Sequence, residues 1–559
     1  MPVNESGSGR LDLGIRRSSG FFIAIIIFLI AVKIPAIIDT DIQPWDEGMY
    51  AARVNSIMIN GDFLDQSLHS VGKFYSGSHP PLLIWLGYFA SLAFGFHPIV
   101  LKLLMFAIAL CCAYFVYKTG IRFFSESTGI FAVMIFAGNI LFNVFSKRFQ
   151  LDLPYVMFML ISFYLIMKLS KDGRPHYAIL AGLAFGLCLM SKILVGMFIP
   201  VALAVSMAAS KGKSPVSVGQ YFTILITGLA VAVPWHAYMI ISHGSAFTDY
   251  FFGFHVFERA LSGVEMNQKA SGPFYYFNYL LSVIPFGVVL LFAFIRDAKN
   301  YKCMSYQKIL LWSWTICGFI ILTLFSTKLE SYLFLVLPAV CLLIADYLGE
   351  ARFENMKTKT LLIALVAFNL LWFATEEARP ELKELAAGTN IFIVIMIILL
   401  VAGLLFLLSR SLVNSFNPGF ILRTLIIVTF ISINIFYVIE RPLWEYRFRI
   451  SDIVNAVNGS GARKIVYVGT SYRYNPQFSY YFNGLDLGWR NPAYEYEFMD
   501  TDIGVEKVMA RLKEEKDGSV IIVERNQINR ADYPLTAEFV PPEFKLIEKD
   551  PGYELYGKP

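Results

Sequence analysis

Charged side chains are scarce in this chain of 559 residues, of which they make up only 16%. Hydrophobic residues make up 56%, and the mean hydropathy is +0.57. A water-soluble globule cannot hide this much apolar surface in one core, so the composition excludes a soluble protein and predicts a chain that lies mostly in lipid. The net charge of +5 is small for this length, which argues against nucleic acid or another polyanion as a partner.

Cysteine is also scarce, and its distribution excludes two classes of site. The six cysteines lie in apolar runs or in one short loop, and none lies in the last 200 residues. This pattern does not support a disulfide framework. The sequence has no His-x-x-x-His spacing and no cysteine pair that would favour a metal site. His79 and His255 are therefore interpreted as hydrogen-bonding residues of a substrate site, and we expect neither a metal nor a cofactor.

Long apolar runs, in contrast, are abundant. The run His79–Phe96 begins with two prolines and has polar surroundings, which predicts a helix lying in the membrane interface. The first run follows Arg16 and Arg17 without a small-residue cleavage site, which predicts an uncleaved first helix. Apart from 79–96, thirteen runs are candidate spans of a hydrocarbon core of about 30 Å, and the first run is one of them: 21–38, 99–121, 127–146, 153–169, 177–191, 193–209, 218–241, 272–295, 308–326, 331–348, 358–375, 391–409 and 419–439.

Basic residues decide the predicted topology. With a cytoplasmic N-terminus and residues 79–96 left out of the count, every short cytoplasmic loop carries Lys or Arg, as the positive-inside rule requires. We therefore predict a transmembrane domain at 1–440 with a first outer loop at 39–98. An outer soluble α/β domain is predicted at 441–559. Its strings "ARKIVYVGT" and "GSVIIVERN" predict buried strands, and residues 504–514 are predicted to form a helix.

Three acids on the predicted outer face are candidate catalytic residues. Asp46 and Glu47 follow the first span in "QPWDEGMYAARVNSIMINGDF", and Asp152 opens a helix after the turn in "SKRFQLDLPY". Carboxylates that converge from two loops could deprotonate and orient a hydroxyl nucleophile, which is general-base chemistry. Each acid taken singly is equally typical of a solvated loop or a helix cap.

Cations on the same face form a complementary set. Lys192 lies in "LMSKILVG", Arg259 ends "FFGFHVFER", and Lys328 precedes Tyr332 in "STKLESYLFLVLP". A basic group at the end of an apolar helix often only reaches toward water. Together, however, these groups favour a clamp for a phosphate leaving group. The aromatic stretches "FYYFNY" and "DYFFGF" fit an interfacial belt or a platform for a sugar or prenyl chain.

The ordered set of these strings resembles a known family over nearly the whole chain. The strings are "QPWDEGMYAAR", "NGDF", "HPPLLIW", "QLDLPYVMF", "LMSKILVGMFIP", "VPWHAYMI", "YFFGFHVFERA", "GPFYYFNYL" and "KLESYLFLVLP". The family is that of the polyprenyl-phosphate-sugar-dependent membrane glycosyltransferases of the GT-C fold. It includes protein O-mannosyltransferases and the bacterial aminoarabinose transferase of lipid A.

The resemblance implies transfer of a sugar from an undecaprenyl-phosphate carrier to a lipid, glycan or protein acceptor outside the membrane, with inversion and without a metal. It places Asp46 at the catalytic centre as base or orienting carboxylate, with Glu47 beside it and Asp152 in support. It implies phosphate contacts for a further set of residues, Lys192, Arg259, Lys328 and Tyr332. A bacterial inner membrane is expected from the lipid A branch, while an archaeal or reticulum membrane stays open.

Two departures leave the substrate open. Met49–Tyr50 stands where the aminoarabinose branch has Arg-Tyr, and Gly77–Pro80 stands where that branch has Phe-Glu-Lys-Pro. Both changes remove a charged group from the phosphate-facing region. The lipid A acceptor and the aminoarabinose donor are therefore not assigned.

Two other classes of function stay open. A transporter or flippase of lipid-linked sugars would place ionisable residues deep within spans, but here only Lys33 and Lys102 occur, near span ends, and no inverted repeat is evident. A noncatalytic partner in envelope glycan assembly would be expected to lose the three acids, all of which are present.

Overall fold

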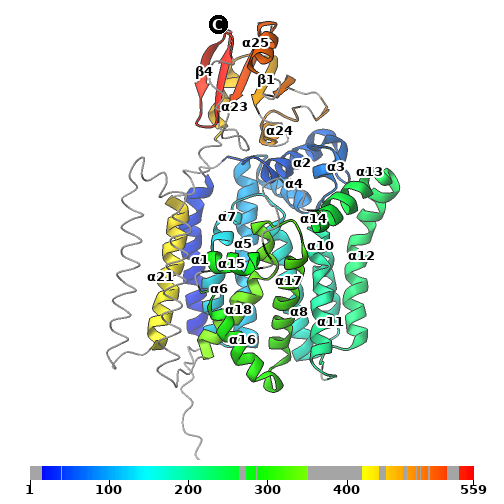
Figure 1. Cartoon of the computed structure of the whole chain (residues 1–559), viewed down its shortest axis with the longest axis vertical. Helices are drawn as coiled ribbons and strands as arrows, with labels where there is room; N and C mark the ends of the chain where they lie inside the picture. The colour runs from blue at the N-terminus through cyan, green and yellow to red at the C-terminus, as the bar shows by residue number, and fades with distance from the viewer. Residues whose placement is uncertain are drawn as a thin grey trace, which may run out of the picture.

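The computed structural model describes most of the chain. The described residues are 15–38, 41–212, 214–262, 272, 274–284, 286–350, 418–439, 449–469, 475–485, 487–490, 493–500, 504–515, 517–525 and 540–558. They form a helical bundle with a small sheet region beyond one of its ends (Figure 1).

The bundle contains helices of very different length. Its elements are α1 (Ile15–Ile38), α5 (Pro98–Phe123), α6 (Glu126–Ala137), α7 (Ile140–Phe145), α8 (Asp152–Asp172), α9 (His176–Leu189), α10 (Ile193–Gly196), α11 (Phe198–Ala209), α12 (Val218–His243), α13 (Ser245–Thr248), the π-helix η2 (Asp249–Glu258), α14 (Arg259–Leu261), α15 (Tyr275–Val283), α16 (Val289–Lys299), η3 (Tyr301–Cys303), α17 (Tyr306–Leu324), η4 (Glu330–Leu335), α18 (Leu337–Glu350) and α21 (Pro418–Ile439). Within the described residues, five helices are long and apolar enough to cross a membrane: α1, α5, α8, α12 and α17.

Several predicted spans are broken rather than continuous. The run 127–146 is divided between α6 and α7, because the Asn139 side chain accepts a hydrogen bond from the Phe142 N–H and so starts a new helix. The run 193–209 begins with the short α10, and 272–295 is divided between α15 and α16. The runs 358–375 and 391–409 lie outside the described residues, so the number of thirteen stays a prediction.

Close helix packing fixes the end of α9, which leads into the turn at Lys192. A Cβ atom at Gly182 would lie 2.7 Å from the Ile224 carbonyl oxygen of α12, and one at Gly186 would lie 2.7 Å from the Gly228 carbonyl oxygen. Glycines spaced four apart let two helix backbones approach in this way. Any larger residue at these two positions would push α9 and α12 apart.

The first-loop segment (residues 41–97) lies on the end of the bundle that faces the sheet region (Figure 1). Its elements are α2 (Asp46–Asn60), η1 (Ser67–His69), α3 (Phe74–Gly77) and α4 (Leu82–Phe94). Helix α4 packs against α2 and α5. With 13 residues it is about 20 Å long, which is too short to cross a hydrocarbon core.

In its described residues, the C-terminal sheet region (residues 449–558) contains five strands and three helices: α23 (Ser451–Gly459), β1 (Lys464–Gly469), α24 (Gln477–Tyr481), β2 (Glu495–Asp500), α25 (Val505–Lys513), β3 (Ser519–Glu524), β4 (Lys545–Lys549) and β5 (Tyr553–Gly557). The strand order is β2-β1-β3-β5-β4. Strand β1 is parallel to β2 and β3, whereas β5 is antiparallel to β3 and β4. Strands β1 and β3 and helix α25 are the elements that the sequence predicts.

Successive hydrophobic side chains of the central strands point to opposite faces of the sheet, so that a hydrophobic core forms on each face. Ile465 and Tyr467 of β1 pack with residues of α23 and α24, whereas Val466 and Val468 pack on the other face with α25. This period of two is the pattern of a strand that is covered on both sides. Phe478 of α24 packs in one of these cores, and α24 also contacts α2.

Candidate active site

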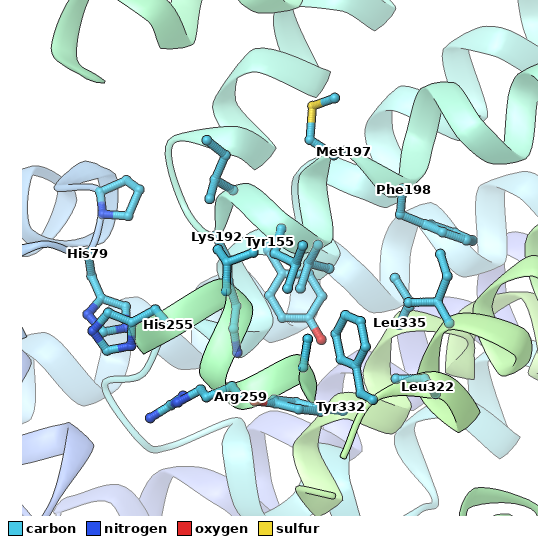
Figure 2. Close-up of a pocket in the computed structure, with 18 of the residues that line it drawn as sticks. His79, Tyr155, Lys192, Met197, Phe198, His255, Arg259, Leu322, Tyr332 and Leu335 are labelled. Carbon is cyan, nitrogen blue, oxygen red and sulfur yellow. The ribbon is translucent and has the colours of Figure 1, made fainter. Parts of the chain in front are cut away.

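A cavity of about 300 Å³ opens between α10, α11, the η2–α14 segment and the α17–η4 turn (Figure 2). One part of its wall is apolar and includes Val201, Phe198 and Leu335. The opposite part gathers the polar lining residues, which are His79, Tyr155, Lys192, His255, Arg259 and Tyr332. An apolar body with a cationic end suits an amphipathic anion.

Lys192 and Asp152 form the centre of the polar end. The Lys192 Nζ atom lies 3.4 Å from the Asp152 Oδ1 atom, and Asp152 is only 5% exposed. The same ammonium group lies over the rings of Tyr155 and Tyr332, 5.6 and 5.2 Å from their centroids. Two aromatic faces and one carboxylate thus hold the cation at the cavity wall.

His79 and His255 lie beside this cation, as Figure 2 shows, with ring centroids 4.3 Å apart. The His255 Nε2–H donates to the Tyr75 carbonyl oxygen at 2.8 Å. Burial, followed by the charges of His255, Arg259 and further cations, lowers the pKa of His79 well below its ordinary value. His79 is therefore a neutral imidazole in a positively charged surrounding, which favours an anion.

Asp46 is exposed in the first turn of α2. The helix dipole stabilises a carboxylate at this position. The residue before it, Trp45, has φ 67°, a conformation that L side chains rarely adopt. Strain of this kind persists only where the surrounding structure enforces it, so the entry into α2 is a tightly determined part of the fold.

Tyr50 lies next to the cavity residue His79, and the sequence analysis did not name it as a site residue. It lies one helical turn after Asp46, and its ring is 5.8 Å from that of His79. Burial raises the pKa of Tyr50 well above its ordinary value; the charges of Asp46 and Asp152 raise it further, while those of Arg53 and Arg259 lower it. Its i, i+4 spacing from Asp46, which places the two residues on one face of α2, was the available signal.

Glu47, predicted as a second catalytic acid, is fully buried and faces other partners. Its Oε1 atom lies 3.2 Å from the Lys102 Nζ atom, and Lys102 is 1% exposed. The carboxylate also accepts hydrogen bonds from the Gln43 N–H at 3.0 Å and the Phe149 N–H at 3.1 Å. Glu47 thus fastens α2 to α5 and to the turn that leads into Asp152.

Lys328, predicted as a phosphate ligand, lies outside the cavity lining. Its Nζ atom donates to the carbonyl oxygens of Leu322 and Thr323 at 2.6 and 2.8 Å, which caps the end of α17. Tyr332 and Arg259, in contrast, line the cavity. The structure therefore brings together Asp152, Lys192, His79, His255, Arg259 and Tyr332. Asp46 is not among the residues that line the cavity, and Glu47 and Lys328 lie in supporting positions.

Within the described residues, no group of three His, Cys, Asp or Glu side chains is placed to hold a metal ion. The expectation that no metal is needed stays a prediction.

Residues 78–238 match the family described as dolichyl-phosphate-mannose-protein mannosyltransferase, and this range includes His79, Asp152 and Lys192. The structure of ArnT from Cupriavidus metallidurans bound to undecaprenyl phosphate superposes with a TM-score of 0.67, covering 96% of this chain and 98% of that chain at 14% identity. The chain has a GT-C fold of the ArnT type.

The apo form of the same ArnT superposes with a TM-score of 0.64 and equal coverage at 13% identity. Among curated sequences, an undecaprenyl phosphate-alpha-4-amino-4-deoxy-L-arabinose arabinosyl transferase from Edwardsiella ictaluri is 23% identical over 351 residues, which cover 61% of this chain. An uncharacterized protein from Aquifex aeolicus is 19% identical over 319 residues, which cover 57% of this chain. Each match covers 62% of the relative's length.

The resemblance to GT-C glycosyltransferases that the sequence strings carry is therefore confirmed at the level of the fold. The five long apolar helices and the ArnT-type fold together make the chain an integral membrane protein.

Proposed function

We propose that this chain is a membrane glycosyltransferase that moves a sugar from a polyprenyl-phosphate carrier to a hydroxyl-bearing lipid, glycan or protein acceptor. The observation that carries this proposal is the cavity itself. Its apolar wall fits a prenyl chain, and its polar end offers Lys192 and Arg259 to a phosphate, with the neutral His79 beside them. The ArnT structure of the same fold was determined with undecaprenyl phosphate bound.

In the proposed reaction, the oxygen of the acceptor hydroxyl attacks the anomeric carbon of the donor sugar, and Asp46 takes the proton of that hydroxyl. The bond between that carbon and the phosphate oxygen breaks, and its electron pair stays with the leaving polyprenyl phosphate. Lys192 and Arg259 stabilise the charge that develops on the leaving group. Attack from the side opposite the phosphate inverts the anomeric centre.

Asp152 has a positioning role in this scheme. A cation that is held by one carboxylate and two aromatic rings keeps its place when the phosphate departs. Such preorganised charges lower the barrier because they need no rearrangement during the reaction.

The proposal places the site on the outer side of a bacterial plasma membrane, with the N-terminus in the cytoplasm. The basic short loops on the opposite side support this orientation. The donor sugar and the acceptor are left to experiment, because the residues around His79 differ from those of the aminoarabinose branch.

The test uses purified protein, membrane extract as the acceptor source and a panel of polyprenyl-phosphate sugars labelled in the sugar. Release of polyprenyl phosphate and transfer of label into the extract are measured for the wild type, Asp46→Asn and Asp517→Asn. Asp517 is a matched control, since it is a 97% exposed aspartate of the C-terminal sheet region.

We expect one donor to be consumed by the wild type and by Asp517→Asn, and the rate for Asp46→Asn to fall by at least about a hundredfold. Full activity of Asp46→Asn would remove Asp46 from the mechanism. Absence of turnover with every donor would count against the transferase itself.

A further inference from the structure

The C-terminal sheet region touches the helix that carries Asp46. Helix α24 packs on α2, and a Cβ atom built on Gly48 would lie 2.5 Å from the Gln477 backbone nitrogen and 2.9 Å from its Cα atom. Gly48 is two residues from Asp46, so the two backbones meet within one helical turn of the proposed base. Even a methyl group at this position would require one backbone to move.

Polar and apolar contacts extend this interface along α2. The Tyr481 hydroxyl accepts a hydrogen bond from the Ile42 N–H at 3.0 Å, and the Asn55 side chain donates to the Tyr480 carbonyl oxygen at 3.2 Å. A separate apolar cluster joins the two parts of the chain: Met49, Ala52, Val71, Leu487 and Trp489. The interface therefore holds α2 along most of its length.

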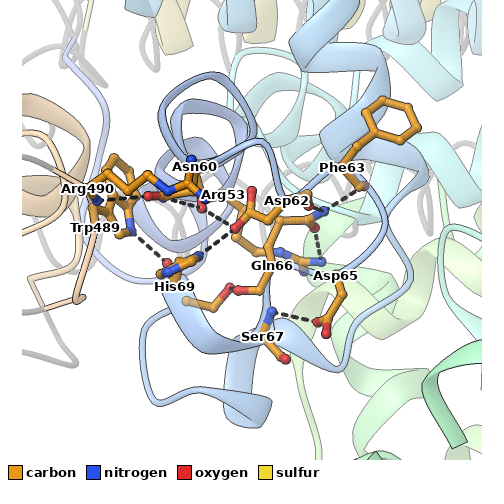
Figure 3. Close-up of polar contacts among 12 residues, drawn as sticks. Arg53, Asn60, Asp62, Phe63, Asp65, Gln66, Ser67, His69, Trp489 and Arg490 are labelled. Carbon is orange, nitrogen blue, oxygen red and sulfur yellow. Dashed lines mark hydrogen bonds and ion pairs between the residues drawn. The ribbon is translucent and has the colours of Figure 1, made fainter. Parts of the chain in front are cut away.

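A second connection runs from Trp489 into the first-loop segment (Figure 3). The Trp489 indole N–H donates to the His69 carbonyl oxygen at 2.9 Å. The His69 Nδ1–H donates to Asp62 Oδ2 at 2.9 Å, and this oxygen also accepts from the Ser56 hydroxyl of α2 at 2.6 Å. Trp489 thus fixes the loop that follows α2.

The connection continues to the backbone of His79. Gln66 donates to the Asp62 carbonyl oxygen at 2.6 Å and accepts from the Arg53 guanidinium at 2.9 Å. Arg53 also donates to the carbonyl oxygens of Ser76 at 2.8 Å and His79 at 3.1 Å. Burial lowers the pKa of Arg53 to about 10, so this 1% exposed group is still a cation at neutral pH. A buried cation shared among fixed oxygens allows little movement of the His79 loop.

We propose that the C-terminal sheet region is a positioning element of the active site, in which Gln477 supports the start of α2 at Gly48 and Trp489 supports the His79 loop. This inference rests on the proposed function. The two supports act on Asp46 and His79 from outside the cavity, and neither Gly48 nor Trp489 lines it. A displacement of about 1 Å at a reacting group can lower a rate about a hundredfold, so support at this distance is sufficient to affect turnover.

The test compares two substitutions in the full chain with matched controls. Gly48→Ala inserts a methyl group against Gln477, and Trp489→Phe removes the indole N–H while keeping an aromatic ring. The controls are Gly20→Ala in α1, where a new Cβ meets no atom within 4 Å, and Trp312→Phe, whose indole donates to Asp297 instead. For each variant, kcat, the Kd for undecaprenyl phosphate and the thermal midpoint are measured.

We expect kcat to fall about ten- to a hundredfold in Gly48→Ala and about three- to tenfold in Trp489→Phe. The Kd should stay within about twofold of wild type in both, because Lys192 and Arg259 are not supported by these contacts. Both controls should keep the wild-type kcat.

Two outcomes would overturn the inference alone. If Gly48→Ala and Trp489→Phe lower the thermal midpoint but keep the wild-type kcat, the interface stabilises the fold and does not position the active site. Parallel losses of kcat and undecaprenyl phosphate binding would show that the whole site is disrupted. Should Gly48→Ala fail to fold, Trp489→Phe decides alone. Absence of wild-type turnover is a distinct result, which removes the proposed function and this inference together.

Discussion

Replacing Glu47 by Gln should destabilise the protein strongly, whereas replacing the adjacent Asp46 by Asn should lower its stability by no more than about 1 kcal/mol. Glu47 is fully buried and accepts from Lys102 and from the backbone N–H groups of Gln43 and Phe149. Asp46 is exposed. We therefore expect Glu47 to have a structural role, whereas the proposed catalytic role belongs to Asp46.

The magnitude follows from the burial of the Glu47–Lys102 pair. Removal of one partner leaves the other charge in a low-dielectric surrounding, which costs about 3–5 kcal/mol. Removal of both charges in Glu47→Gln/Lys102→Met leaves no unpaired ion, and the glutamine oxygen still accepts one backbone N–H. We expect the double variant to lie within about 1–2 kcal/mol of wild type.

The free energy of unfolding is measured by denaturant titration in detergent for the wild type, both single variants and the double variant, with Asp46→Asn as the exposed control. The reasoning predicts a coupling energy of at least about 2 kcal/mol between positions 47 and 102. Additive effects of the two single substitutions would refute it. Equal destabilisation by Asp46→Asn would show that exposure does not distinguish the two acids.

Three further predictions concern the cavity. Lys328→Met should change the Kd for undecaprenyl phosphate less than about twofold, because the Lys328 ammonium group binds helix carbonyls. Lys192→Met should raise this Kd at least about tenfold. Equal effects of the two substitutions would show that Lys328 also binds the phosphate. Tyr50→Phe should lower kcat about tenfold at constant Kd, since its hydroxyl lies among the charges of the site, and wild-type kcat would exclude it. Because burial lowers the pKa of His79, its contribution to stability is present above the unfolded-state pKa of about 6.5 and is lost as pH falls toward the native pKa. Acidification from neutral pH to pH 5.5 should therefore lower the free energy of unfolding by about 1 kcal/mol more in wild type than in His79→Gln. Denaturant unfolding at the two pH values measures this difference.

Periodicity in the sequence was sufficient for the elements whose signal is local. The run 99–121 corresponds to α5, and the alternation in "KIVYVG" corresponds to β1, because lipid contact and burial on both sheet faces each impose a simple pattern. The divided run at 127–146 was not predicted, since Asn139 caps a helix only when the backbone around it has already turned. An apolar stretch shows how much surface is buried but not whether the helix is continuous.

Residue type predicted which side chains could serve the site but not which of them face it. Asp46 and Glu47 are adjacent acids with the same chemistry, and only the direction of each on α2 separates an exposed carboxylate from a buried one. Lys192 and Lys328 are both lysines at helix ends, yet one lies over two aromatic rings of the cavity and the other caps α17. These distinctions depend on contacts far apart in the sequence, such as that between Glu47 and Phe149, which no local pattern encodes.

The interface between α2 and the sheet region also has a consequence for biosynthesis. Gly48 and Gln477 are separated by more than 400 residues of chain, and the ribosome makes the proposed base long before its support. A nascent chain that already exposes Asp46 and has inserted α8 with Asp152 still lacks the residues that hold the start of α2. Contacts of such long range form late, since the closure of a long loop must precede them. Competence for transfer would therefore arise only after Trp489 has been made, and shorter nascent chains in the membrane would not consume the lipid-linked donor.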